Sequence, residues 1–383
     1  MPHWTITTLA LLAAAALVLF FFATWAHLRF WTRRLTLALE YVSSEQITTP
    51  DGGTIELRRI PIPATTTRAL LPPVLLVHGL GANHRNQDLH PDFSLARHLA
   101  ARGRDVWLLT LRSGLRPRSW AERRRIRFDA MTENDLPVAV RGVLERTGTP
   151  ALDYVGFSMG GMLLYAAIGR SVPQELIRRV VIVGSPARVG VARWMRPLLR
   201  RVPRALVPTM RFRLGAAGFA FASEWLRTPF HEVTINPGNV APGITRAAMV
   251  NLIEDIPGPL YADFIEWAGA DGEIRTSRGA ALPGLQSVTA PALFLAGTAD
   301  KLAPISSVRW AFDAWGKDLP KTTKRFVTVG RAHGQLQDYG HGDLAIGTSV
   351  AVDLFAPIAS FLEEDVAEVA ADTAVAAIAA AGA

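Results

Sequence analysis

The fold is decided by a stretch that reads Tyr154-Val155-Gly156-Phe157-Ser158-Met159-Gly160-Gly161 and contains the pattern Gly-x-Ser-x-Gly. An apolar segment of strand length, 152–155, precedes it, and an apolar stretch of helical length, 162–168, follows it. Strand, sharp turn and helix are the context in which this pattern forms a nucleophile elbow, with a serine hydroxyl exposed on a strained turn. A chance match in a glycine-rich loop is the alternative, and the flanking segments favour the elbow.

Strand-like and helix-like segments alternate on both sides of this motif. The strand-like runs are 54–62, 74–77, 105–111, 152–155 and 180–183. Helical spacing marks 93–102 and 134–147, where Pro137 fits the first turn. This alternation predicts an α/β fold, a mostly parallel sheet with helices on both faces. Residues 35–50 are expected to form a connector.

The alternation stops after residue 183 and resumes at 292–296, a gap much longer than one crossover between parallel strands requires. We therefore expect an inserted helical cap, broken into short helices by prolines. The last strand and helix are predicted at 325–329 and 350–362. The predicted division is an N-terminal anchor with its flank at 1–34, a first core part at 50–185, the cap at 186–287, a second core part at 288–362, and an alanine-rich, disordered tail at 363–383.

The N-terminal segment has no charged residue from Thr5 to Ala26, which is about the 20 residues that span a bilayer as a helix. Tryptophans stand near both ends, at Trp4, Trp25 and Trp31. A secretory signal is the alternative, but it has a shorter apolar run preceded by basic residues. The basic residues follow instead, at Arg29, Arg33 and Arg34, so the positive-inside rule predicts a single-pass membrane protein with a cytoplasmic catalytic domain.

Composition excludes several classes of chemistry. The 383 residues include no cysteine, which rules out disulfides, thiolate catalysis and thiolate metal sites. His78, His84 and His90 lie close in sequence without carboxylates at a recognisable ligand spacing, so no metal is expected. The net charge of +8 favours anionic surfaces such as lipid head groups. No nucleic-acid-binding module is recognisable, so no nucleic-acid partner is expected.

A serine nucleophile needs a histidine base that is oriented by a carboxylate, and after an elbow the order is serine, acid, histidine. Asp300 meets this order, because it follows the strand-like run 292–296, whereas Asp153 precedes the serine. Two histidines follow the last predicted strand, His333 and His341. We favour His341 as the base, because it stands before the last helix between two glycines that let its loop bend.

The oxyanion of an acyl-transfer intermediate needs two backbone donors. The amide of Met159, just after the nucleophile, is one candidate, and the amide of Leu80 in the glycine-rich loop after strand 74–77 is the other. A dinucleotide-binding fingerprint is the alternative for this loop, but it requires a third glycine where His84 stands.

Four motifs together resemble the α/β-hydrolase superfamily over residues 50–362. They are His78-Gly79-Leu80-Gly81, Gly156-Phe157-Ser158-Met159-Gly160-Gly161, Gly297-Thr298-Ala299-Asp300 and Gly340-His341-Gly342-Asp343-Leu344. Within the superfamily, residues 78–89, 94–96 and 105–107 resemble the acid-lipase and polyhydroxyalkanoate-synthase-like branch. Those synthases use a cysteine nucleophile, so serine at position 158 favours ester hydrolysis over polymer synthesis. The resemblance implies an enzyme without a metal or organic cofactor.

These features predict a membrane-anchored serine hydrolase of carboxylic esters, lipase-like or esterase-like, with the catalytic triad Ser158, Asp300 and His341 and a hydrophobic acyl or lipid ester as substrate. An acyltransferase with the same triad and a catalytically inactive, membrane-anchored binding protein are the alternatives. The arginine-rich stretch 188–213 carries large apolar residues, so it is expected either to lie on an anionic membrane surface or to form a solvated cap helix. The sequence leaves the oligomeric state open.

Overall fold

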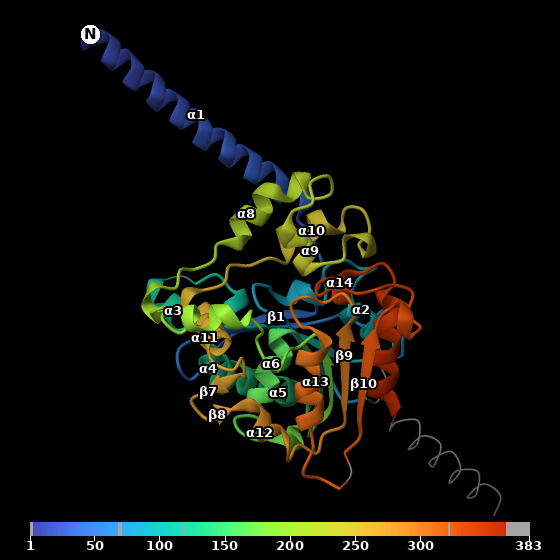
Figure 1. Cartoon of the computed structure of the whole chain (residues 1–383). Helices are drawn as coiled ribbons and strands as arrows, with labels where there is room; N and C mark the ends of the chain where they lie inside the picture. Colours follow the sequence, from blue (N-terminus) through green and yellow to red (C-terminus); the bar gives the residue numbers. More distant parts are fainter. Residues whose placement is uncertain (1–2, 68–70, 118, 321, 365–383) are drawn as a thin grey trace, which may run out of the picture.

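The structure is a computed structural model that describes residues 3–67, 71–117, 119–320 and 322–364. An eight-stranded sheet lies at its centre (Figure 1), in the order β1-β2-β4-β3-β5-β6-β9-β10. β2 pairs antiparallel with β1 and β4, and the other neighbours are parallel. The strands are β1 Ser43–Thr48, β2 Thr54–Arg59, β3 Val74–Val77, β4 Val106–Thr110, β5 Leu152–Phe157, β6 Ile177–Val183, β9 Ala292–Gly297 and β10 Lys324–Val329. The predicted mostly parallel sheet is confirmed.

β1 corrects the expectation that residues 35–50 form a connector. The strand pairs with β2 at the edge of the sheet, and none of its six residues is fully buried. The one apolar side chain of β1, Ile47, is only partly buried against the main core, so the strand lacks the apolar alternation by which strands are recognised. The sheet therefore begins at Ser43, ahead of the expected first core part at 50–185.

Helices cover both faces of the sheet, and the alternation along β3 shows how. Leu75 and Val77 pack into a core with α5 (Leu136–Thr147), α6 (Met159–Ala167), α12 (Ala281–Leu285) and α13 (Ile305–Ala314). Val74 and Leu76 point the other way, into a core with α2 (Leu95–Ala101) and the C-terminal helical segment 356–364. Successive residues of a strand face opposite sides, so this short, fully buried strand contributes to both cores.

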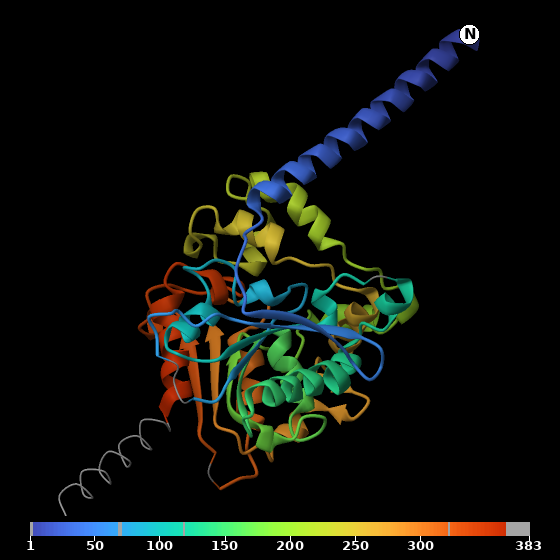
Figure 2. The ribbon, with the colours of Figure 1, turned by 180° about the vertical axis from the view of Figure 1, so that it is seen from behind.

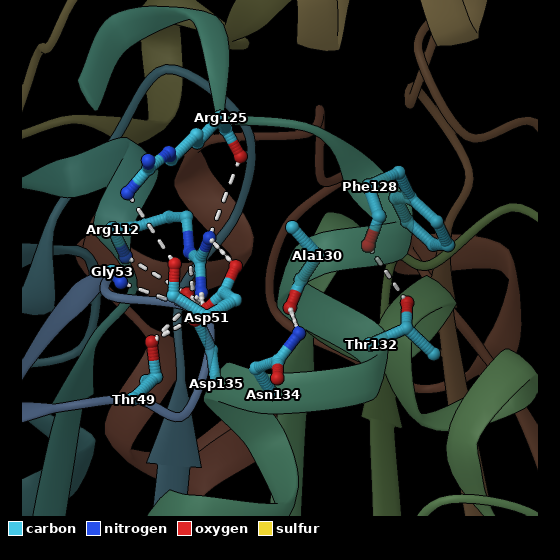
Figure 3. Close-up of polar contacts among 10 residues, drawn as sticks. All are labelled: Thr49, Asp51, Gly53, Arg112, Arg125, Phe128, Ala130, Thr132, Asn134 and Asp135. Atoms are coloured by element: carbon cyan, nitrogen blue, oxygen red, sulfur yellow. Dashed lines mark hydrogen bonds and ion pairs between the residues drawn. The ribbon is translucent and has the colours of Figure 1, made fainter. Parts of the chain in front are cut away.

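The helix before the elbow differs from the prediction at its start. α4 (Phe128–Ala130) and the π-helical turn Met131–Asp135 run directly into α5, so Pro137 lies within a longer helical segment. Proline has no N–H to donate, and the π turn directly before it changes the hydrogen-bond pattern at that point. The side chains of Thr132 and Asn134 donate to the carbonyls of Phe128 and Ala130 at 2.9 and 3.2 Å (Figure 3).

The segment between β6 and β9 is mostly helical. It contains α7 Arg196–Leu199, α8 Phe212–Phe219, α9 Pro229–Thr234, α10 Ile244–Asn251, α11 Gly258–Gly269, the hairpin of β7 Arg275–Thr276 and β8 Gly279–Ala280, and α12. Figure 1 shows α8, α9 and α10 beyond the carboxyl ends of the strands, the edge at which functional loops of parallel sheets gather. α12 instead packs in the main core, against the face that also carries α6 and α13.

The N-terminal helix α1 (His3–Leu35) projects away from the rest of the molecule (Figure 1 and Figure 2). It is the one helix in the described ranges that is long and apolar enough to cross a membrane, and none of its most apolar window is buried. Its C-terminal part is docked: the His27 side chain lies 2.9 Å from the Gly218 carbonyl, and the ring of Trp31 stacks on Phe221. Most of the expected disordered tail, 365–383, lies outside the described residues.

Candidate active site

Ser158 occupies a strained turn between β5 and α6. It has a φ of 50° and a ψ of −116°, and it is the one non-glycine residue with a positive φ among the described residues. Its N–H donates to the Val183 carbonyl at 2.9 Å, which holds the turn at the carboxyl end of the sheet. A Cβ at Gly156 would lie 2.6 Å from the Gly161 nitrogen, and one at Gly160 would overlap the Val77 carbonyl. The glycines of the motif are therefore required by backbone packing.

A continuous hydrogen-bond chain starts at this serine. His341 Nε2 lies 2.9 Å from Ser158 Oγ, and His341 Nδ1 lies 2.8 Å from Asp300 Oδ2. Asp300 stands directly after β9, where its second oxygen accepts the N–H groups of Leu302 and Ala303 at 2.9 and 2.8 Å. Those two donors orient the carboxylate, and the carboxylate orients the imidazole toward the serine.

The alternative candidates for the base and the acid, His333 and Asp153, lie away from Ser158. His333 is exposed at the end of a 3₁₀ turn, Arg331–His333, so His341 is the candidate that the structure brings to Ser158. Asp153 is completely buried and accepts hydrogen bonds from Arg178 at 2.9 and 2.7 Å, as well as pairing with Arg104. Asp153 therefore holds two arginine side chains in place and has no contact with the serine.

The loop after β3 lies against the serine. A Cβ at Gly79 would be 3.1 Å from Ser158 Cβ, so a larger residue would crowd the serine and glycine allows the close approach. Leu80 follows Gly79 in this loop, and Met159 follows the serine. Among the described residues, neither amide N–H of this pair has a protein acceptor, and both are thus available to a bound oxygen.

Side chains that the sequence analysis did not assign hold this loop. The Gly79 N–H donates to Asn86 Oδ1 at 3.0 Å. His78 is buried, donates from Nδ1 to the Gly79 carbonyl at 2.8 Å, and accepts the Leu111 N–H on Nε2 at 3.1 Å. Burial lowers the pKa of His78 to about 4, which keeps the ring neutral and allows it to accept on one nitrogen and donate from the other.

Arg112 holds the neighbouring loop, which packs on His78. Its guanidinium binds Asp51 at 2.6 and 2.8 Å and Asp135 at 2.8 Å, joining the turn after β1 to the helical segment before α5 (Figure 3). Two residues later, a Cβ at Gly114 would lie 2.9 Å from His78 Nε2. The arginine therefore keeps in place the backbone against which the buried histidine rests.

The sequence model of the alpha/beta hydrolase fold family matches residues 72–334. The chain belongs to the alpha/beta hydrolase fold family. Human gastric triacylglycerol lipase is 32% identical over 42% of this chain and 43% of its own length, and human lipase member K is 33% identical over 41% of each. The chain thus spans about two fifths of the length of these relatives.

A solved esterase from Thermogutta terrifontis shares the fold of this α/β-hydrolase. Its TM-score is 0.51 at 18% identity, and the match covers 84% of this chain and 99% of the esterase. The likeness supports the order and direction of the strands described above. The predicted resemblance to α/β-hydrolases and the predicted fold class are confirmed.

The loop that carries His341 in this hydrolase is tied to the helical insertion. The buried carboxylate of Asp343 accepts the Gly340 N–H at 3.0 Å, the Asn236 N–H at 2.8 Å and the Asn239 side-chain amide at 2.9 Å. Burial raises the pKa of Asp343 above its usual value, and the three hydrogen bonds offset only part of that rise. No sequence signal distinguished Asp343 from an ordinary helix N-terminal acid, because two of its partners, Asn236 and Asn239, lie about a hundred residues away.

An apolar cavity of about 390 Å³ lies in the insertion, beside both loops. Its lining includes Phe212, Phe219, Ile235, Met249, Ile253 and Ile346. Ile253 forms a backbone bridge with Ala82 of the loop after β3, and the Ile235 side chain lies against Gly342 next to His341. The insertion therefore has room for an apolar group beside the loops that carry His341 and Leu80.

The acidic and histidine side chains of the described residues bear on whether the chain could hold a metal ion. Within the described ranges, no group of three or more histidine, aspartate or glutamate side chains is arranged to hold a metal ion. The arrangement that remains is one hydroxyl, one imidazole and one carboxylate in sequence, with two free amides nearby.

Proposed function

We propose that this protein is a membrane-anchored serine hydrolase that cleaves carboxylic esters with a hydrophobic acyl group. One observation carries the proposal, the hydrogen-bond chain from Ser158 Oγ through His341 to Asp300, with distances of 2.9 and 2.8 Å. A serine hydroxyl is a weak nucleophile unless a base removes its proton, and this chain supplies the base and the group that orients it.

Each residue of the site has a role in the proposed reaction. Ser158 Oγ attacks the acyl carbon while His341 Nε2 takes its proton, and the imidazolium then protonates the departing alkoxide. The amides of Leu80 and Met159 hold the tetrahedral oxyanion. Water then attacks the acyl-enzyme with His341 as the base, which releases the acid and restores the serine. Asp300 keeps Nδ1 protonated and stabilises the imidazolium.

The apolar cavity supports a hydrophobic acyl chain as the group next to the scissile ester. Its volume of about 390 Å³ lies within the usual range for ligand pockets, about 300–1,000 Å³. The names of the relatives, a triacylglycerol lipase and a lipase, support a lipid ester. We propose residues 186–287 as the cap over the site, between the core parts 50–185 and 288–362, with α12 leading back into the core.

α1 is proposed as a single transmembrane helix. Its large apolar side chains are exposed, Leu12 and Phe20 for example at 62% and 64%, and a helix that is apolar on all sides requires apolar surroundings. Residues 27–35 of α1 dock on α8 and α10. These contacts support a helix that stays in the mature protein over a signal that is cleaved. Arg29, Arg33 and Arg34 support a cytoplasmic location for the hydrolase domain.

A fluorophosphonate probe tests the catalytic proposal. We expect labelling of the wild type and none of Ser158→Ala, together with hydrolysis of p-nitrophenyl esters that increases with acyl length. Labelling that persists in Ser158→Ala would refute the assignment of the nucleophile. Product analysis with and without an added alcohol separates hydrolysis from acyl transfer, since only transfer yields a new ester.

Membrane extraction tests the anchor. We expect the full chain to remain with membranes in alkaline carbonate, and its hydrolase domain to be protected from protease in right-side-out vesicles. A mature protein whose N-terminus lies beyond residue 26 would show that α1 is a cleaved signal.

A further inference from the structure

His231 in the first turns of α9 is a buried polar side chain in an apolar part of the insertion. Only 4% of its surface is exposed, and its ring lies 5.9 Å from the ring of Phe219. Among the described residues, its Nε2 has no hydrogen-bond partner and is shielded from solvent. A buried polar atom without a partner costs about 1–3 kcal/mol, so an unpaired Nε2 of this kind calls for a ligand that satisfies it.

The other ring nitrogen defines the tautomer. The backbone N–H of Thr228 donates to His231 Nδ1 at 3.1 Å, as part of the capping box that starts α9. An N–H donor requires a lone pair on Nδ1, so the proton of the neutral ring is on Nε2. Burial lowers the pKa of His231, which favours this neutral form. Nε2 is therefore a hydrogen-bond donor, directed away from Thr228.

His231 stands between two cavities. It lines the apolar cavity of about 390 Å³ described above and also a second cavity of about 330 Å³. Ile235 and Thr245 line both as well, so the two cavities adjoin at these three residues. The second cavity has polar and charged lining residues, Ser223, Glu224 and Arg227 among them.

The second cavity also lies on the side of the molecule to which α1 is attached. Its lining includes Trp225, which is 73% exposed and follows shortly after Phe221, the residue on which Trp31 of α1 stacks. An exposed tryptophan beside an apolar helix suits the interfacial region of a membrane. An amphiphile has both an apolar chain for the first cavity and a polar part for the second.

We propose that His231 Nε2 donates a hydrogen bond to an oxygen of an amphiphilic substrate that spans the two cavities. The apolar cavity would hold an acyl chain, and the polar cavity would hold a second oxygen-bearing group beyond the scissile ester, as in a diacyl glycerol. This inference rests on the proposed ester hydrolysis and adds a residue that selects diesters over simple monoesters. Among the described residues, the hydrogen bonds of the His231 ring go to Thr228 and none goes to Ser158, so its role is recognition of substrate.

The test compares two esters with the same acyl chain on the full-length protein in detergent. The readout is the ratio of kcat/KM for 1,2-dihexanoyl glycerol to kcat/KM for p-nitrophenyl hexanoate. For His231→Leu we expect this ratio to fall roughly five- to tenfold, the loss of one buried hydrogen bond. His231→Gln keeps an acceptor for the Thr228 N–H and a donor for the ligand, so it should retain the ratio within about threefold. Thermal unfolding checks that His231→Leu is folded. An unchanged ratio in the folded variant overturns the proposal.

A binding measurement separates this proposal from the proposed catalytic function. A dihexyl glycerol diether keeps two acceptor oxygens and has no cleavable bond, and its binding to wild type and to His231→Leu is followed by tryptophan fluorescence. We expect a Kd about fivefold weaker in the variant, and an equal Kd counts against His231 as the donor. If the diether binds in a manner that depends on His231 but the protein has no esterase activity, the proposed hydrolase function is refuted and the proposed binding site at His231 is retained.

Discussion

The buried carboxylate of Asp343 accepts the backbone N–H of Asn236 at 2.8 Å, which joins the loop of His341 to the helical insertion. The same carboxylate accepts the N–H of Gly340, the residue directly before His341. A shift of the insertion is thereby transmitted to the backbone that carries the imidazole. The position of the proposed base thus depends on contacts between segments about a hundred residues apart.

Replacing Asp343 tests this dependence. Asp343→Ala leaves the backbone N–H groups of Gly340 and Asn236 without their acceptor, one of them directly before His341, so we expect kcat to fall at least tenfold with KM changed less than threefold. The free energy of unfolding should fall by about 2–3 kcal/mol. Ester kinetics and urea unfolding measure the two effects. A variant that loses stability yet keeps full kcat would show that Asp343 supports the fold without positioning His341.

The two histidines after β10 provide a matched comparison. His341→Ala removes the base within 2.9 Å of Ser158, so kcat should fall by about a thousandfold or more. His333→Ala removes an exposed side chain and should leave kcat within twofold. Steady-state kinetics on one p-nitrophenyl ester is sufficient, and the reverse pattern would assign the base to His333.

The strain at Ser158 predicts a stability difference between two inactive variants. Both Ser158→Ala and Ser158→Gly remove the hydroxyl, but only glycine adopts a φ of 50° without steric cost. We expect Ser158→Gly to be more stable than Ser158→Ala by about 1 kcal/mol in urea unfolding. Equal stabilities would mean that the turn is not strained.

His78 predicts a loss of stability in acid. Its pKa is about 4 in the folded protein and 6.5 without burial, so below pH 6.5 the unfolded chain binds a proton that the folded chain does not. Stability is then lost as the pH falls from 6.5 toward 4, by up to about 3 kcal/mol.

A glutamine variant isolates this effect from other titrating groups. The difference in free energy of unfolding between wild type and His78→Gln should be constant above pH 7 and should shift against the wild type as the pH falls below 6.5. Chemical unfolding at several pH values measures it. A difference that does not change between pH 7 and 4.5 would contradict the neutral, buried ring.

Local backbone requirements explain which parts of the fold and of the site could be predicted from the sequence. Gly156, Gly160 and Gly79 are glycines because a Cβ would overlap neighbouring backbone or crowd the serine, so the elbow and the loop after β3 were recognisable from residue identity. Buried parallel strands such as β3 consist of uninterrupted apolar residues because both of their faces are covered. Such strands could therefore also be recognised from residue identity. β1 had no such mark, because Ile47 is its one apolar residue and is only partly buried.

The sequence by itself determined the fold class, the order of serine, acid and histidine candidates, and an apolar segment long enough to span a bilayer. Only the tertiary structure decided that His341 rather than His333 reaches Ser158, that Asp343, Asn86 and His78 hold the loops around it, and that α1 docks on the insertion. The physical reason is the range of the interactions. Steric limits and burial act on each residue and its chain neighbours, whereas these hydrogen bonds join side chains whose approach depends on how the whole chain packs.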